Sequence, residues 1–96
     1  MELNRKKGLI VGLGKSGVAA ARFLKRRGAD VTVTDMADEA HLNPAVAEVR
    51  GLGIPLELGG HRTATFEKSD FIVVSPGVPH TIAPLQQARA KGIPVL

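Results

Sequence analysis

The stretch that decides the fold is GLIVGLGKSG, residues 8–17, in which a short apolar run leads into a cluster of glycines. Residues 8–12 are too few for a helix, and their continuous apolar character is typical of a strand buried on both faces of a parallel sheet. A GxGxxG pattern runs from Gly12 to Gly17. A turn of this kind between a strand and a helix brings backbone amides close to a phosphate group. The stretch therefore predicts a parallel α/β fold with an anion-binding turn.

The glycine turn can be interpreted as a dinucleotide fingerprint, as an ATP-binding P-loop, or as a phosphate site for another nucleotide. The P-loop pattern GxxxxGK[ST] requires glycine at position 9, where Leu9 stands, so Lys15 is not assigned to an ATP γ-phosphate. In the other two interpretations Gly12 permits the tight turn, Gly14 lets the backbone approach a diphosphate, and Gly17 lets the helix pack on the strand. A glycine turn that serves packing alone is the alternative.

The rest of the chain alternates between strand and helix patterns. We expect strands at residues 8–12, 30–35, 54–58, 71–74 and 93–96, and helices at 16–27, 44–50 and 82–90, with one helical turn near 65–68. This order predicts a Rossmann-like, doubly wound, five-stranded parallel sheet with strand order 3-2-1-4-5 and flanking helices. Because the sequence stops within the fifth strand, we expect it to be a piece of a longer protein.

Two local predictions concern the helices. In the helix at 16–27 we expect Val18, Ala21, Phe23 and Leu24 to lie near one buried face. In the helix that begins at Pro44 we expect Asn43 to act as the N-cap. We expect Ala45, Val46 and Val49 to face inward.

Length and composition exclude several classes of function. Ninety-six residues suit a single domain, and the absence of cysteine excludes disulfides and thiolate sites. The net charge of +4 comes with only 3% aromatic residues and no basic stripe, so we expect no nucleic-acid partner. The apolar run at residues 9–11 is too short for a signal peptide or a membrane span. We therefore expect a cytoplasmic protein with no membrane partner.

Two further features belong to the carboxyl edge of the predicted sheet. Asp35 ends the second strand, 18 residues beyond Gly17, where dinucleotide enzymes use an acidic residue to accept hydrogen bonds from a ribose. The loop SPGVP, residues 75–79, follows the fourth strand and faces the glycine turn across the point where such sheets bind ligands. Asp35 and the loop are therefore candidate nucleotide contacts, with an ordinary surface aspartate and a plain turn as the alternatives.

No catalytic or metal-binding constellation is evident. His41, His61 and His80 lack the spacing of metal ligands and have no serine or cysteine partner, so we expect loop histidines. No carboxylate pair or triad is present in the sequence pattern. We therefore expect neither catalytic residues nor a metal site within these 96 residues.

The chain resembles the N-terminal domain of the D-glutamate-adding enzymes of the Mur ligase family, which act in peptidoglycan synthesis. The resemblance rests on three segments: IVGLGKSGVAAARFLKRRGADVTVTD (10–35), FIVVSPGVP (71–79) and KGIPVL (91–96). It covers nearly the whole chain. The glycine turn is shared with many Rossmann-like proteins, whereas SPG(V/I)P after the fourth strand is far more specific.

The resemblance implies a domain that binds the UDP part of UDP-N-acetylmuramoyl-L-alanine. The residues that it assigns to this site are Gly12, Gly14, Lys15, Ser16, Gly17, Asp35, Met36, Ser75, Pro76 and Gly77. The backbone amides of Lys15 and Ser16 would approach the diphosphate, Met36 would flank the uracil, and residues 75–77 would close over the base. Position 15 is often apolar in the family and position 36 often polar, so we expect backbone contacts at both.

The resemblance also implies what lies outside this sequence. In the full ligase a central domain supplies a P-loop, Mg²⁺ and a catalytic lysine, and a C-terminal domain binds D-glutamate. ATP phosphorylates the substrate carboxylate, and the amine then attacks the acyl phosphate. Residues 1–96 should therefore bind the UDP substrate without catalysing, and need no cofactor of their own.

Three alternatives stay open at this point. An NAD(P)-binding domain of an oxidoreductase, or a nucleotide-sensing domain of a transporter regulator, explains the glycine turn and Asp35 equally well but gives no reason for the SPGVP loop. A pure interaction module would leave the turn empty. A Mur ligase that adds another amino acid would share this domain.

Overall fold

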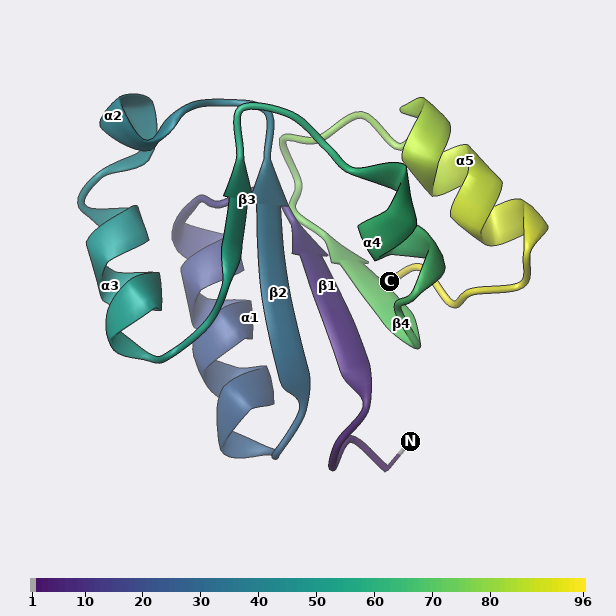
Figure 1. Cartoon of the computed structure of the whole chain (residues 1–96), viewed down its shortest axis with the longest axis horizontal. Helices are drawn as coiled ribbons and strands as arrows, with labels where there is room; N and C mark the ends of the chain where they lie inside the picture. Colours follow the sequence, from purple (N-terminus) through teal and green to yellow (C-terminus); the bar gives the residue numbers. More distant parts are fainter. Residues whose placement is uncertain (1) are drawn as a thin grey trace.

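The computed structural model describes residues 2–96 as an α/β fold built on a parallel sheet (Figure 1). The elements are β1 (Lys7–Val11), α1 (Lys15–Arg26), β2 (Asp30–Asp35), α2 (Glu39–Leu42), α3 (Ala45–Gly51), β3 (Leu56–Leu58), α4 (Thr63–Glu67), β4 (Phe71–Val74) and α5 (Ala83–Ala90). Strands and helices alternate as the sequence predicts. The β-branched run of β2 and the apolar run of β4 fall within the expected bounds.

The sheet has four strands in the order β3-β2-β1-β4, all parallel. β1 lies in the centre, with Val11 opposite Thr34 of β2 on one side and Val74 of β4 on the other. The carboxyl ends of these three strands therefore meet at one edge. The connections that follow β1 and β4 leave the sheet side by side at this edge, which is where ligands bind in folds of this kind.

The prediction of a fifth strand at residues 93–96 is wrong. This segment runs beside β4, and Ile72 N donates to Pro94 O, Val74 N to Leu96 O and Leu96 N to Ile72 O. It forms only one isolated parallel bridge, between Ile72 and Val95. Because Pro94 has no N–H, it cannot donate to a ladder, and the segment is too short to make up that loss. The observed order is therefore 3-2-1-4 rather than 3-2-1-4-5.

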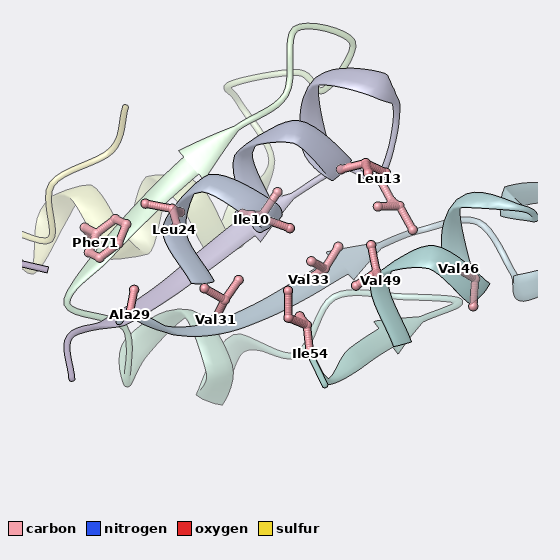
Figure 2. Packing of buried hydrophobic residues seen from close by; sticks show 12 residues of the cluster. Ile10, Leu13, Leu24, Ala29, Val31, Val33, Val46, Val49, Ile54 and Phe71 are labelled. Carbon is pink, nitrogen blue, oxygen red and sulfur yellow. The ribbon is translucent and has the colours of Figure 1, made fainter. Parts of the chain in front are cut away.

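Two apolar clusters fill the two faces of the sheet. One joins Ile10, Val31, Val33 and Phe71 of the strands to α1 and α3 (Figure 2). The other lies on the opposite face, where Leu9, Val11 and Ile72 pack against Phe66 of α4 and Leu85 of α5. Alternate residues of β1 therefore point into different clusters, as the pleat of a strand requires.

The first helix buries a narrower face than the sequence suggests. Val18, Ala21 and Leu24 are buried, but Phe23 is 51% exposed. At 100° per residue, position 23 points away from the stripe that positions 18, 21 and 24 form. The guanidinium of Arg27 instead lies over the Phe23 ring, 4.7 Å from its centroid. The prediction of Phe23 as an inward residue is therefore wrong.

Two other local predictions differ from the structure. Pro44 rather than Asn43 is the N-cap of α3, and no side chain caps that helix. Asn43 instead is the C-cap of α2, where its N–H donates to Glu39 O, and the sequence pattern predicted no helix at Glu39–Leu42. β3 is shorter than predicted because Ile54 N donates to Val49 O in the turn that ends α3.

The remaining helices agree with the expected pattern in place and differ in length. The turn expected near 65–68 is α4, and α5 begins one residue later than predicted, with Ile82 as its N-cap. Across residues 2–96, none of the helices combines the length and apolar character that crossing a bilayer requires.

Candidate functional site

A pocket of about 460 Å³ opens at the carboxyl edge of the sheet, between the turn that follows β1 and the loop that follows β4. Its lining residues are Gly12, Leu13, Gly14, Ser16, Asp35, Met36, His61, Ser75, Pro76, Gly77, Val78, Pro79 and Ile82. This volume lies within the range of ligand sites. The pocket therefore forms where the parallel-sheet prediction expects a ligand.

The structure brings eight of the ten predicted site residues to this pocket: Gly12, Gly14, Ser16, Asp35, Met36, Ser75, Pro76 and Gly77. The two exceptions are Lys15 and Gly17. Lys15 lines a separate groove of about 430 Å³, which lies between α1 and the α2–α3 region and shares only Leu13 and Gly14 with the pocket. Gly17 lies behind the turn, where it has a packing role.

Two glycines shape the turn by the lack of a side chain. Gly12 has φ +97°, and a Cβ there would lie 2.6 Å from Val78 Cγ2. A Cβ at Gly17 would lie 2.4 Å from Gly12 O, a distance that real Cβ atoms do not adopt. These two positions therefore require glycine for the backbone conformation and for the close approach of α1 to the end of β1.

Gly14 differs, because a Cβ at this position meets nothing within 4 Å. It is the N-cap of α1, has no side-chain cap, and is followed by a first turn without acidic residues. The N–H groups of Lys15, Ser16 and Gly17 have no intrahelical partner at this end of the helix. The start of α1 therefore presents open space and backbone donors that favour an anion.

Asp35 is bonded to the protein backbone through both carboxylate oxygens. Oδ2 accepts from Leu13 N at 2.7 Å, and Oδ1 accepts from Ala37 N at 2.9 Å. The first bond fixes the glycine turn against β2, and the second fixes the chain as it leaves β2. Asp35 thus positions the turn, whatever further contact it makes with a ligand.

Ser75 holds the same turn from the other side. Its Oγ donates to Gly12 O at 2.6 Å, and its N–H donates to Val11 O at 2.9 Å. Because Gly12 O and Leu13 N belong to one peptide group, Ser75 and Asp35 hold the two ends of that group. We call it the pinned peptide. It fixes the direction in which the following amides point.

His61 is the pocket residue that sequence reasoning missed. Its Nδ1 lies 2.8 Å from Oγ1 of the fully buried Thr34, and its ring meets Phe66 edge-on at 5.7 Å between centroids. Burial lowers the pKa of His61 below its ordinary value, and the carboxylate of Asp35 partly offsets this effect. The ring is therefore held in place and favoured in its neutral form.

The matched family model describes the N-terminal domain of MurD-like Mur ligases, and it covers residues 6–96. The chain belongs to this family. Curated relatives named UDP-N-acetylmuramoylalanine--D-glutamate ligase include those of Desulfosudis oleivorans, 59% identical over the whole chain, and Pelobacter propionicus, 55% identical over the same length. The chain spans about a fifth of the length of these relatives: 21% of the first and 22% of the second.

Solved structures agree with the family at the level of the fold. A pseudomurein peptide ligase type C from Methanothermus fervidus superposes with a TM-score of 0.77 at 31% identity, over 96% of this chain and 19% of that one. D-lactate dehydrogenase from Escherichia coli has a TM-score of 0.70 at 22% identity, over 99% of this chain and 29% of that one. The second likeness shows the shared Rossmann-like fold alone.

The remaining walls of the pocket are mostly apolar. Val78, Pro79 and Ile82 follow the predicted SPG loop, and Leu13 lies within the glycine turn. Met36 is 64% exposed at the pocket, although it is a large apolar side chain. A flat, partly apolar group fits such walls better than a fully hydrated one. The proline loop indicated this wall in the sequence, but no short-range pattern indicated His61, which reaches the pocket from the loop between β3 and α4.

Asp35 and Ser75, two polar residues of the pocket, are engaged within the protein. Within residues 2–96 no three His, Asp or Glu side chains are grouped closely enough to hold a metal ion. Asp35 is engaged with two backbone amides, and the hydroxyl of Ser75 is engaged with a carbonyl.

Proposed function

We propose that this chain is the UDP-binding domain of a ligase that adds D-glutamate to UDP-N-acetylmuramoyl-L-alanine. The observation that carries the proposal is the open start of α1 beside Gly14, which faces the apolar loop after β4 across one pocket. Backbone donors on one wall suit a diphosphate, and apolar side chains on the other suit a base. The family and the names of its curated relatives supply the identity of the nucleotide.

In this proposal the diphosphate lies over the backbone amides of Lys15 and Ser16, beside Gly14. The uracil lies between Met36 and residues 75–77, which line the pocket from opposite strand ends. The Lys15 side chain faces the neighbouring groove instead, so its contribution is its backbone N–H. The ten residues that the resemblance assigns thus divide into ligand contacts and residues such as Gly17 that shape the turn.

The catalytic parts of the proposed ligase lie in other domains of the protein. ATP and Mg²⁺ would bind there, because the chain described here has Leu9 where a P-loop needs glycine, and residues 2–96 hold no cluster of metal ligands. These 96 residues bind and orient the nucleotide end of the substrate. We also propose that the whole enzyme works in the cytoplasm in peptidoglycan precursor synthesis, with UDP-N-acetylmuramoyl-L-alanine and the other domains of its own chain as partners.

A nucleotide titration tests the proposal. Amide shifts of the 96-residue chain would be recorded with UDP, UDP-N-acetylmuramoyl-L-alanine and NAD. We expect both uridine nucleotides to shift Gly14 and Ser16, and NAD to leave them unmoved at equal concentration. Saturation by NAD with no response to UDP would favour an oxidoreductase domain, and no response to any nucleotide would favour an interaction module.

A valine at Gly14 tests the place of the diphosphate. Its side chain would enter the open space at the start of α1, so Gly14→Val should abolish UDP binding while the fold is retained. Gly51→Val in α3 is the matched control, because a Cβ there also meets nothing within 4 Å and the residue lies outside the pocket. Undiminished UDP affinity in Gly14→Val would contradict the assignment of the turn.

A further inference from the structure

The polar side chains of the pocket differ in whether they have a protein partner. Both oxygens of Asp35 accept backbone N–H groups, and the hydroxyl of Ser75 donates to Gly12 O. In the part of the chain that the structure describes, two polar side chains of the lining have a hydroxyl or a ring nitrogen that makes no hydrogen bond to the protein. These are the hydroxyl of Ser16, beside the proposed diphosphate position, and Nε2 of His61.

The imidazole of His61 is fixed from two directions. Nδ1 is hydrogen-bonded to Oγ1 of Thr34, a fully buried residue of β2. The ring stands at 78° to the ring of Phe66, whose side chain is also fully buried. A ring held in this way keeps its one orientation without a ligand, so a contact through Nε2 costs little ordering.

The hydrogen bond to Thr34 selects one tautomer of His61. If Nδ1 carried the proton and donated to Oγ1, the hydroxyl hydrogen of Thr34 would need another acceptor, whereas among residues 2–96 this hydroxyl is hydrogen-bonded to His61 alone. A buried hydroxyl hydrogen without an acceptor costs about 1–3 kcal/mol. Thr34 therefore donates to Nδ1, and the ring proton of neutral His61 resides on Nε2.

From this geometry we propose that His61 is a specificity-determining residue, whose Nε2–H donates a hydrogen bond to a carbonyl oxygen of the bound base. The inference rests on the proposed function, because it takes the ligand to be a uridine nucleotide. Uracil carries two carbonyl oxygens, and adenine carries none. The donor lies on the β2–β3 side of the pocket with Asp35 and Met36, where the base rather than the diphosphate is placed.

The tautomer is tested without any ligand. Two-bond ¹H–¹⁵N correlation spectra of the free chain near pH 7.5 should show His61 protonated on Nε2 and bare on Nδ1. Thr34→Val, which keeps the shape but removes the hydroxyl, should convert His61 to a mixture of tautomers. A wild-type spectrum with the proton on Nδ1 would overturn the inference.

The contact is tested with two substitutions and two ligands. His61→Phe keeps a ring against Phe66 but has no donor, and it should weaken UDP binding about fivefold, as expected for one neutral hydrogen bond. His61→Gln keeps an N–H near the Nε2 position and should restore most of the affinity. Inorganic pyrophosphate, which has no base, should bind all three proteins equally.

The outcomes separate this inference from the proposed function. If UDP binds the wild type and His61→Phe equally well, the inference fails while the proposed function stands. If His61→Phe weakens pyrophosphate as much as UDP, the contact is not with the base, and the inference also fails. If the wild type binds no uridine nucleotide, the proposed function fails and the specificity role fails with it, whatever the tautomer spectrum shows.

Discussion

The glycine turn is held by two anchors that differ in charge and in distance along the chain. On the β2 side, the carboxylate of Asp35 accepts from Leu13 N, 22 residues away. On the β4 side, the neutral hydroxyl of Ser75 donates to Gly12 O, 63 residues away. Both bonds are made to the pinned peptide, one at each end. The two strand ends that flank the pocket therefore act on a single backbone group.

Asp35 and Ser75, which the sequence predicts as nucleotide contacts, therefore also hold the backbone of the protein itself. A carboxylate that accepts two backbone amides and a hydroxyl that donates to a carbonyl both shape the protein before any nucleotide arrives. Each bond polarises the shared peptide group in the direction that strengthens the other. We therefore expect the two anchors to be coupled, with the charged one contributing more.

The largest expected effect, on stability and nucleotide binding together, comes from Gly17→Ala, which places a new side chain against the pinned peptide. The new Cβ would lie 2.4 Å from Gly12 O, so the turn must move, and we expect this movement to weaken the β4 anchor. Overpacking of this kind costs about 1–3 kcal/mol and outweighs the gain of up to about 1 kcal/mol from replacing a helical glycine. Chemical denaturation should show net destabilisation, together with loss of UDP binding.

Gly51→Ala is the control for that change. Gly51 also lies in a helix, α3, but a Cβ there meets nothing within 4 Å. We expect this variant to be as stable as the wild type or more stable. Equal stability of Gly17→Ala and Gly51→Ala would show that the close contact in the turn does not destabilise the folded protein.

Asp35→Asn should break the β2 anchor. An asparagine offers one acceptor oxygen where the backbone presents two N–H groups, so the N–H of Leu13 or of Ala37 is left facing another donor. The expected loss is about 1–3 kcal/mol in the free energy of unfolding at pH 7. Asp30→Asn, at the exposed start of β2, changes the net charge equally and should be nearly neutral.

Ser75→Ala should break the β4 anchor at a smaller cost. We expect about 1 kcal/mol from the loss of one neutral hydrogen bond. In the double variant with Asp35→Asn, the loss should be smaller than the sum of the two single losses, because each substitution already weakens the bond that remains. Strict additivity in chemical denaturation would mean that the anchors do not act on one group.

The smallest expected effect is a pH dependence of stability, which arises from His61 on the β2 side of the pocket. The pKa of His61 is lowered in the folded state, so the unfolded chain binds the proton more readily. Stability from this group is therefore complete above the unfolded pKa of about 6.5 and falls as the pH drops from there through the folded pKa. Denaturation curves of the wild type and His61→Gln should converge over that window; parallel curves would contradict the shift.

Much of this architecture is readable from local patterns. The β-branched run of β2, the apolar run of β4 and the glycine pattern each carry their own signal, and the pocket forms where those three elements end. Gly12 and Gly17 have the backbone roles that their spacing predicts. The strands and the backbone conformation of the turn were predictable because they depend mainly on neighbours within a few residues.

The errors have three different physical causes. Asparagine often caps the start of a helix, but Asn43 ends α2 instead of starting α3. The segment 93–96 forms only one bridge to β4, and its Pro94 cannot donate to the ladder. His61 has no sequence signal, since its role depends on Thr34, which is 27 residues away. Contacts over such distances are set by the sheet as a whole.

The pinned peptide also has a consequence for how the protein folds. Its two hydrogen bonds join residues separated by 22 and 63 positions, so the turn acquires its binding shape only after β2 and β4 have both docked on β1. Non-local pairings of this kind form slowly, because chain entropy must be lost before they are made. A shortened chain that ends before Ser75 would keep every glycine of the turn and still lack the site. Nucleotide binding is therefore a measure of completed folding.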